Sequence, residues 1–365
     1  MNDARAWLWQ ALALPMLRSL AAALSVFALG CSSGGTPASP GASGTSGSGG
    51  AAGSGGNAGT GGASGTAGAA GNGGSAGTAG AGSGGTGGTS DPDAGEICAP
   101  RSAGPTPESV CLLEVTGRIV DETGAPISGL PTSVCGPVCF NGESDANGVF
   151  KVTPGVHLDL RDYSVNPHGR PARAGFYYQL PVDRTGPAID VGDVMLPALP
   201  LEGPTLVVKS DRTGAPAQTV NNGEVTLDVP AGTLVNLDVE DVLAAEVGKR
   251  FRVLAVPAAQ RSVFAKPELG LRALYALAPF ESSFVKEGDL SPSTARLSFA
   301  NAAGFAPGAA VEVLALGTYL YPEWVRPAAF ERVATAKVSG DGTRIEMDPG
   351  QGVAHLTWFG LRELP

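Results

Sequence analysis

The chain contains little of what most catalytic sites are built from. Histidine occurs only three times in 365 residues, as His157, His168 and His355, and 16% of the side chains are charged. No Ser/His/Asp order, paired carboxylates or H-E-x-x-H helix can be assembled along the chain. Basic residues are also few, 24 against 34 acidic ones, and they gather nowhere. The formal net charge of −10 therefore argues against a nucleic-acid binder.

Residues 32–90 lack charged and aromatic side chains altogether, and they hold almost half of the 54 glycines. With no apolar side chain larger than Ala or Pro, this segment buries too little to offset its ordering entropy. It predicts a disordered Gly/Ser/Ala-rich linker with a root-mean-square reach of roughly 40–45 Å. The G-x-S-x-G at residues 73–77 and the G-x-G-x-x-G at residues 80–85 lack the flanking strand and helix, so we treat both as chance matches.

Long hydrophobic runs are missing as well. Residues 6–17 and 19–30 are uncharged runs divided by Arg18, and each is shorter than the ~20 residues that span a bilayer. From Met16 the chain has instead the pattern of a signal peptide, with a basic start, an apolar stretch and small residues before Cys31. Translation from Met16 fits this pattern better than translation from Met1, and the sequence leaves both open.

The end of the apolar stretch resembles the lipobox of bacterial lipoproteins. Ala28, Leu29 and Gly30 precede Cys31, and Ser32 follows it. The resemblance implies cleavage before Cys31 and lipidation of that residue, and the absence of a following acidic residue implies the outer membrane. Several acyl chains on one residue would anchor the protein firmly. The periplasmic and cell-surface faces both remain open, and a plain secretory signal with an incidental cysteine is the alternative.

Beyond the linker, the composition is ordinary, and the strand patterns predict an all-β protein. We expect a signal peptide (1–30), a lipidated cysteine and tether (31–96), and two β-sandwich-like domains (97–200 and 201–365). Strand patterns in the first domain lie at residues 114–120, 149–152, 163–165, 175–180 and 189–196. Those in the second lie at residues 224–229, 294–299, 311–314, 344–347 and 353–359.

One helix is expected, at residues 238–247. Asp238 would cap it, and Gly248 would end it. Its apolar residues fall on one side of the helix: Val239, Val242, Leu243 and Val247.

Residues 115–196 resemble the carboxypeptidase regulatory-like domain, a transthyretin-like β-sandwich. The resemblance rests on three segments: V-T-G-R-I-V-D with G-A-P-I (115–127), D-A-N-G-V-F (145–150) and D-V-G-D-V-M-L (190–196). It implies a structural or binding module attached to other parts. Residues 225–234 are faintly similar to a segment of ZU5-type interaction domains, which hints at a protein-binding β fold without assigning a functional residue.

Four cysteines besides Cys31 lie in the first domain, and none lies in the second. An even number in an oxidising compartment predicts two disulfides with three possible pairings. We favour Cys98–Cys111 and Cys135–Cys139, because the Gly-Pro-Val segment inside the second pair can turn tightly. Zinc binding by the four thiolates is the alternative.

Few side chains suggest a ligand. Tyr319, Tyr321 and Trp324 place three rings within six residues, a composition found where loops bind glycans or proteins by stacking. The alternative is that Trp324 closes one end of the β core. His157 and Asp159 share one face of a strand pattern, which we interpret as solvated rather than metal-binding.

The remaining polar candidates have structural interpretations. His168 is expected to be exposed in a loop, and His355 to be buried or cross-strand in the last strand. Asp121, Asp145 and Asp341 occupy turns, where Asp often accepts hydrogen bonds from its own backbone; calcium at these loops is the alternative.

These features predict a non-enzymatic lipoprotein that presents binding or structural modules on a flexible tether. No cofactor or metal is expected. The predicted partners are the membrane, through the lipid, and an envelope protein or glycan. The alternative is a carbohydrate-active hydrolase of the cell surface, which would need two acidic residues about 5–9.5 Å apart.

Overall fold

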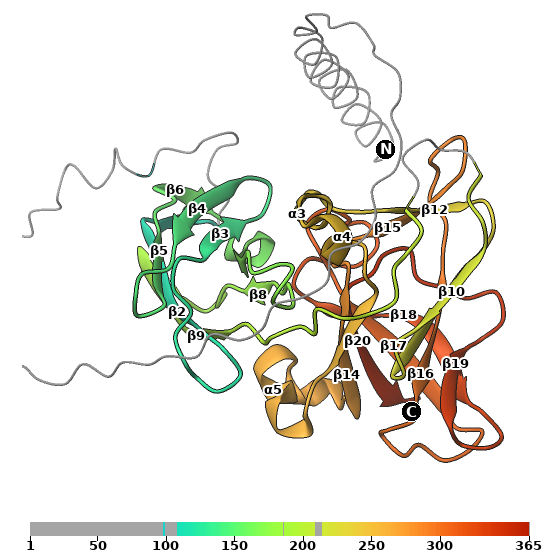
Figure 1. The fold of residues 1–365 in the computed structure, drawn as a ribbon. Coiled ribbons are helices and arrows are strands. Elements are labelled where there is room, and N and C mark those ends of the chain that lie inside the picture. Colours follow the sequence, from blue (N-terminus) through green and yellow to red (C-terminus); the bar gives the residue numbers. More distant parts are fainter. Residues whose placement is uncertain (1–97, 99–107, 185, 209–213, 365) are drawn as a thin grey trace, which may run out of the picture. The chain divides into compact units, whose positions relative to one another are not determined.

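The computed structural model describes residues 98, 108–184, 186–208 and 214–364 (Figure 1). The predicted signal peptide, Cys31 and the linker lie outside the described residues. All described residues belong to one compact unit, Gly84–Pro365. Strands dominate it, so the all-β prediction is confirmed.

The first part of the described chain carries nine short strands. They are β1 (Val110–Leu112), β2 (Glu114–Val120), β3 (Pro131–Cys135), β4 (Cys139–Glu143), β5 (Val149–Val152), β6 (Val156–Leu158), β7 (Ser164–Pro167), β8 (Tyr178–Gln179) and β9 (Ala188–Met195), with a 3₁₀ turn η1 (Leu160–Asp162) after β6. One sheet has the order β5-β2-β9 and a second has the order β4-β3-β7-β8, while β1 pairs with β6. Side chains from both larger sheets, such as Ile119 and Val134, share one hydrophobic cluster, which is the sandwich-like arrangement that the strand spacing predicts.

A large antiparallel sheet dominates the second part. Its strands are β10 (Gln218–Asn221), β11 (Val225–Val229), β13 (Arg252–Ala255), β14 (Ala273–Ala278), β16 (Arg296–Ala300), β17 (Ala310–Leu316), β18 (Phe330–Val338), β19 (Arg344–Met347) and β20 (Trp358–Glu363). They are ordered β10-β11-β16-β19-β18-β17-β20-β14-β13. A separate pair joins β12 (Thr233–Asn236) to β15 (Ser283–Lys286). The expected alternation holds in β11, where Val225, Leu227 and Val229 are buried.

The predicted strand at residues 353–359 is wrong in its placement, because β20 starts only at Trp358. Val353 forms an isolated bridge to Ala295, and His355 forms one to Ser283. Since the two bridging partners belong to different parts of the fold, no continuous ladder forms before Trp358. His355 is buried, as expected.

The expected helix is divided in two. Asp238 caps α3 (Val239–Leu243) by accepting a hydrogen bond from the Glu240 amide, and α4 (Ala245–Gly248) follows. Ala245 interrupts the helix because its φ is 53°, in the left-handed region.

The burial of α3 reverses the usual pattern of an amphipathic helix. Val239, Val242 and Leu243 are 64%, 58% and 80% exposed, whereas Asp241 is fully buried. The polar side faces inward because two buried arginines, Arg170 and Arg252, lie on that side.

Three short helical segments complete the second part: η2 (Ala258–Gln260), α5 (Arg261–Phe264) and η3 (Pro267–Leu269). A third hydrophobic cluster joins α5 and the large sheet to the segment around β8, through Phe176, Phe264 and Trp358. The Trp358 indole donates a hydrogen bond of 2.5 Å to the Gly175 carbonyl oxygen. This cluster sets the floor of the site described next. No helix in the described ranges has the length and apolar character of a membrane span.

Candidate functional site: an aromatic groove

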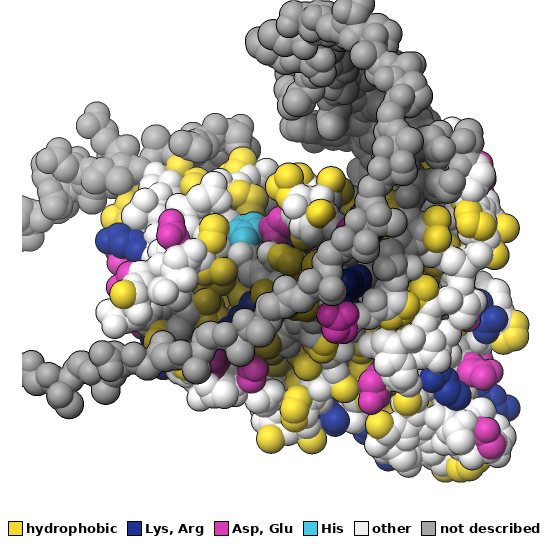
Figure 2. Space-filling model, in the orientation of Figure 1, with side chains coloured by type: hydrophobic (Ala, Val, Ile, Leu, Met, Phe, Trp, Pro, Cys, Tyr) yellow, Lys and Arg dark blue, Asp and Glu magenta, His cyan; other side chains and the backbone are white. Residues whose placement is uncertain are grey.

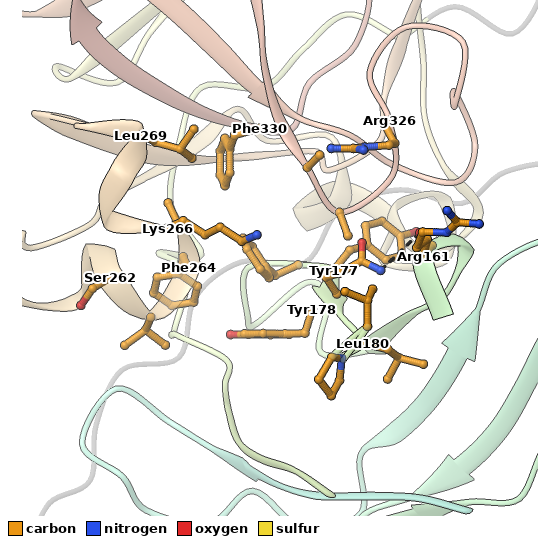
Figure 3. A pocket seen from close by; sticks show the side chains of 18 of the residues that line it. Arg161, Tyr177, Tyr178, Leu180, Ser262, Phe264, Lys266, Leu269, Arg326 and Phe330 are labelled. Carbon is orange, nitrogen blue, oxygen red and sulfur yellow. Dashed lines mark hydrogen bonds between the residues drawn. The ribbon is translucent and has the colours of Figure 1, made fainter. Parts of the chain in front are cut away.

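A groove of about 1060 Å³ opens where the segment at residues 159–183 faces three parts of the second half (Figure 3). These parts are α5, η3 and the loop that leads into β18. Five aromatic side chains line it: Phe176, Tyr177, Tyr178, Phe264 and Phe330. We call this hollow the aromatic groove.

The rings of the groove pack on one another. The ring centroid of Phe176 lies 4.7 Å from that of Tyr178 and 5.3 Å from that of Phe264. Tyr178 and Phe330 are half-buried, so part of each ring remains accessible. The Tyr178 hydroxyl is occupied by donation to the Met195 carbonyl oxygen, which leaves the ring itself as the group that this residue offers. The mutual packing fixes the rings before any ligand arrives.

Three cations stand around the aromatic floor. Arg161, Lys266 and Arg326 are exposed lining residues, and Figure 3 shows the Lys266 side chain extending into the groove. Asp159 holds Arg161 at 2.6 Å, and Arg326 lies 3.7 Å from Glu331. The Lys266 amine makes no ion pair or side-chain hydrogen bond within the described residues.

A second feature, outside the groove, surrounds the buried guanidinium of Arg170. Its side chain is 7% exposed and lies in ion-pair distance of four carboxylates: Asp238 (2.9 Å), Glu240 (2.9 Å), Asp241 (3.2 Å) and Glu281 (3.5 Å). It also donates a hydrogen bond to the Phe280 carbonyl oxygen. We call these five side chains the Arg170 cluster.

The carboxylates of the Arg170 cluster differ in their titration. Burial raises the pKa of Glu281 to about 7 and that of Asp241 to about 6. Burial also disfavours the charged form of Glu240, but hydrogen bonding from His168 and the charge of Arg170 outweigh it and lower the Glu240 pKa. None of the four carboxylates lines the aromatic groove.

His168 contacts the Arg170 cluster through Glu240, so the expectation that it is simply an exposed loop histidine is wrong. Its Nδ1 lies 2.5 Å from a Glu240 carboxylate oxygen, and its Nε2 lies 2.9 Å from the Ser133 hydroxyl. The reason is the inward-facing polar side of α3, which no local pattern around His168 reveals.

His157 and Asp159, which the sequence pattern places on one strand face, lie on different elements in the structure. His157 is half-buried in β6, which ends at Leu158. Asp159 lies beyond the strand and caps η1 by accepting a hydrogen bond from the Arg161 amide. The expected shared face of His157 and Asp159 does not form, because the chain turns between them.

The aromatic residues that the sequence singled out pack against two different partners, and their predicted role in binding stays a prediction. The Tyr319 ring meets Tyr177 edge-on at 5.2 Å. Tyr321 stacks on His355 at 3.5 Å, and Trp324 meets the same imidazole edge-on at 5.0 Å. Trp324 is half-buried against the core of the large sheet, and burial lowers the pKa of His355 to about 4. None of the three is a lining residue of the groove.

The four cysteines of the described chain lie in two pairs that are capable of forming disulfides. Cys98 joins Cys111 with Cα atoms 5.6 Å apart, and Cys135 joins Cys139 with Cα atoms 4.1 Å apart. The second pair closes the turn between β3 and β4, which are neighbours in one sheet. Cys31, the expected lipidation site, lies outside the described residues.

The turn aspartates cap their own backbone, as predicted. Asp121 accepts hydrogen bonds from the amides of Thr123 and Ala125, and Asp145 accepts them from residues 147 and 149. Asp341 accepts hydrogen bonds from the Ser339 hydroxyl and from the Thr343 amide, and these hydrogen bonds lower its pKa to about 2. In the part of the chain that the structure describes, no group of three metal-binding side chains occurs.

Sequence reasoning did not identify the residues of the aromatic groove. Phe176, Tyr177 and Tyr178 are adjacent in the sequence, and this run of three rings was the available signal. Residues 175–180 have the pattern of a strand, so the sequence indicates that these rings are part of a strand and not a binding site. Phe264 and Phe330 are far away along the chain, so only the fold brings them to the same place.

Comparisons with known proteins give no family. No family model matches the chain, and no curated protein matches it. Two similar solved structures are a DUF3823 family protein from Bacteroides ovatus and the major pilin SpaD from Corynebacterium diphtheriae. The first is 9% identical, covers 69% of this chain and 80% of its own, and has a TM-score of 0.16. The second is 12% identical, covers 70% of this chain and 87% of its own, and has a TM-score of 0.19. Such scores carry no argument about function, and the fold class rests on the strand topology alone.

Proposed function

We propose that this protein is a non-enzymatic binding module of the bacterial cell envelope, with the aromatic groove as its ligand site. In this proposal, lipidated Cys31 holds it in the outer membrane and residues 32–90 form a flexible tether. The part with strands β1 to β9 would be a carboxypeptidase regulatory-like domain that forms one wall of the groove.

The aromatic groove is the observation that carries the proposal. Its volume of about 1060 Å³ is at the upper end of the usual size of ligand sites. Rings that already pack on one another, such as Phe176 and Tyr178, lose little conformational entropy when a ligand binds. A few charged groups at the rim would then orient the ligand.

The distribution of titratable groups favours binding over catalysis. General acid–base catalysis needs a group with a pKa tuned near the working pH, within reach of the substrate. Glu281 and Asp241 have such pKa values, but Arg170 holds both, and neither lines the groove. Of the aspartates that do line it, Asp159 is paired with Arg161, and Asp162 and Asp183 lie among its exposed residues. This supports a module that holds its ligand without converting it.

A binding experiment on the full-length lipoprotein in detergent tests the ligand site. We expect Phe330→Ala to weaken binding of envelope glycan fragments at least about tenfold, because it removes an accessible ring of the floor. The matched control is Tyr321→Ala, which removes a half-buried ring outside the groove. If Tyr321→Ala abolishes binding and Phe330→Ala does not, the site lies at the Tyr321 loop. Release of shortened glycan products would contradict the non-enzymatic role.

The anchor is tested separately. We expect globomycin to accumulate unprocessed precursor, and the mature protein to enter the detergent phase after phase separation. Protease treatment of intact cells then distinguishes a surface-exposed head, which is released, from a periplasmic one. A mature protein that stays in the aqueous phase would mean secretion without an anchor, and the groove proposal would stand independently.

A further inference from the structure

We infer that the ligand of the aromatic groove is an acidic oligosaccharide, that is, a glycan whose sugar rings carry carboxylate groups. The inference rests on the proposed function and names the ligand class of the same site. It follows from three observations. The floor consists of aromatic rings, the edge of β8 is too short to pair with a peptide, and the cations Lys266 and Arg326 line the groove.

The floor offers the partly accessible faces of Tyr178 and Phe330, packed on three buried rings, and almost no free polar group. Phe176, Phe264 and Phe330 have no polar atom in their side chains, and the two tyrosine hydroxyls are occupied. The Tyr178 hydroxyl donates to Met195, and the Tyr177 hydroxyl donates to Glu281. Such a floor suits a ligand with a flat apolar face and polar groups around its edge. A pyranose ring has this form.

The wall at β8 is a poor template for an extended peptide. A peptide that adds to a sheet edge needs a row of unpaired backbone groups on the last strand. β8 is the last strand of the sheet β4-β3-β7-β8, but it contains only Tyr178 and Gln179, and Pro181 follows soon after. Proline removes a backbone donor, so the edge ends where a peptide would need it to continue.

Two cations of the lining, Lys266 and Arg326, are available to bind a negatively charged group, although Asp162 and Asp183 line the same groove. Lys266 has no acidic partner in the described chain, and Arg326 has only Glu331 at 3.7 Å, with both side chains largely exposed. An amine and a guanidinium are the groups that bind carboxylates most strongly, and the guanidinium can do so with two parallel hydrogen bonds. Asp162 and Asp183 also line the groove, where they can accept hydrogen bonds from sugar hydroxyls.

The test measures binding of oligogalacturonate and of its fully methyl-esterified form to the full-length lipoprotein in detergent, by calorimetry. The two probes share the same rings and differ in the carboxylate charge. We expect the acidic form to bind about tenfold or more tightly. Lys266→Gln and Arg326→Gln should each remove most of this preference, because each should weaken binding of the acidic form far more than binding of the ester. The control Lys337→Gln removes an exposed lysine that does not line the groove and should change neither affinity.

The outcomes separate this inference from the proposed function. If both probes bind equally and Phe330→Ala weakens both, the charge selection is wrong and the groove remains a glycan site. If an acidic peptide such as oligoglutamate binds and neither sugar does, the glycan class is wrong and the groove remains a binding site. If no probe binds to the groove, the inference is overturned. The proposed function is then tested only by the binding experiment with envelope glycan fragments.

Discussion

Arg170 pairs with more carboxylates than any other basic residue in the described chain. Its guanidinium compensates carboxylates of α3 and of the segment after β14, and it also satisfies the Phe280 carbonyl oxygen. A buried ion pair contributes little net stability, but removing one partner leaves an uncompensated charge, which is costly. The loss of Arg170 would leave several such charges at once.

We therefore expect Arg170→Met to lower the free energy of unfolding at pH 7 by about 3–5 kcal/mol. Chemical denaturation measures this. The control is Arg118→Met, because Arg118 forms a pair with Asp193 at 2.9 Å on an exposed surface, where an ion pair stabilises little. If both variants lose the same free energy of unfolding, the burial of the Arg170 ion pairs does not increase their contribution to stability.

Glu281 makes stability depend on pH, with a sign that follows from its burial. Its pKa rises from 4.5 to about 7 in the folded protein, so between these values the native state binds more protons than the unfolded state. Stability from this group is therefore fully present below about pH 4.5 and is lost as the pH rises towards 7. His355 acts in the opposite direction, because burial lowers its pKa to about 4 and its protonation destabilises the fold at low pH.

Comparison with Glu281→Gln isolates the effect of Glu281. We expect the free energy of unfolding of the wild type, minus that of Glu281→Gln, to fall by on the order of 2 kcal/mol between pH 5 and pH 8. Urea titrations at a series of pH values measure both proteins. A difference that stays constant with pH would mean that Glu281 titrates normally.

At the scale of elements, α3 shows that the side of a helix cannot be assigned from its apolar residues alone. Val242 and Leu243 face solvent although they are apolar, and Asp241 is buried. The close contact of α4 with α3 contributes to this arrangement. A Cβ on Gly248 would overlap the Asp241 carbonyl oxygen, so only glycine allows the two short helices to meet.

We expect Gly248→Ala to lower the free energy of unfolding by about 1–3 kcal/mol, the usual cost of overpacking, because the backbone of α3 has to move. For a chain of this size the melting temperature should fall by several degrees. Gly340→Ala is the matched control, since a Cβ there meets nothing within 4 Å. If both variants melt at the same temperature, the contact between Gly248 and α3 is not tight.

At the scale of the whole described molecule, two features join the segments before and after residue 200. The hydrophobic cluster around Phe176 and Trp358 draws on both segments, and so does the Arg170 cluster. The aromatic groove lies between the same segments and depends on their being held together.

We expect the described unit to unfold in one cooperative transition, because separating the two segments would expose the shared aromatic cluster and the buried charges together. Differential scanning calorimetry measures this, through the ratio of the calorimetric to the van't Hoff enthalpy. Two separate transitions, each with a ratio near one, would show that the segments fold independently.

The sequence alone determined part of the strands, such as β11 and β19, because their patterns are local, whereas β14 and β18 match none of the predicted patterns. The alternation of Val225, Leu227 and Val229 specifies one buried face, and the turn aspartates such as Asp341 bond to backbone only two residues away. Only the tertiary structure decided the groove, the burial of α3 and the role of His168. Each of these depends on contacts between residues that lie far apart in the chain, such as His168 and Glu240. Contacts between such distant residues depend on the packing of whole sheets, and no local pattern records them.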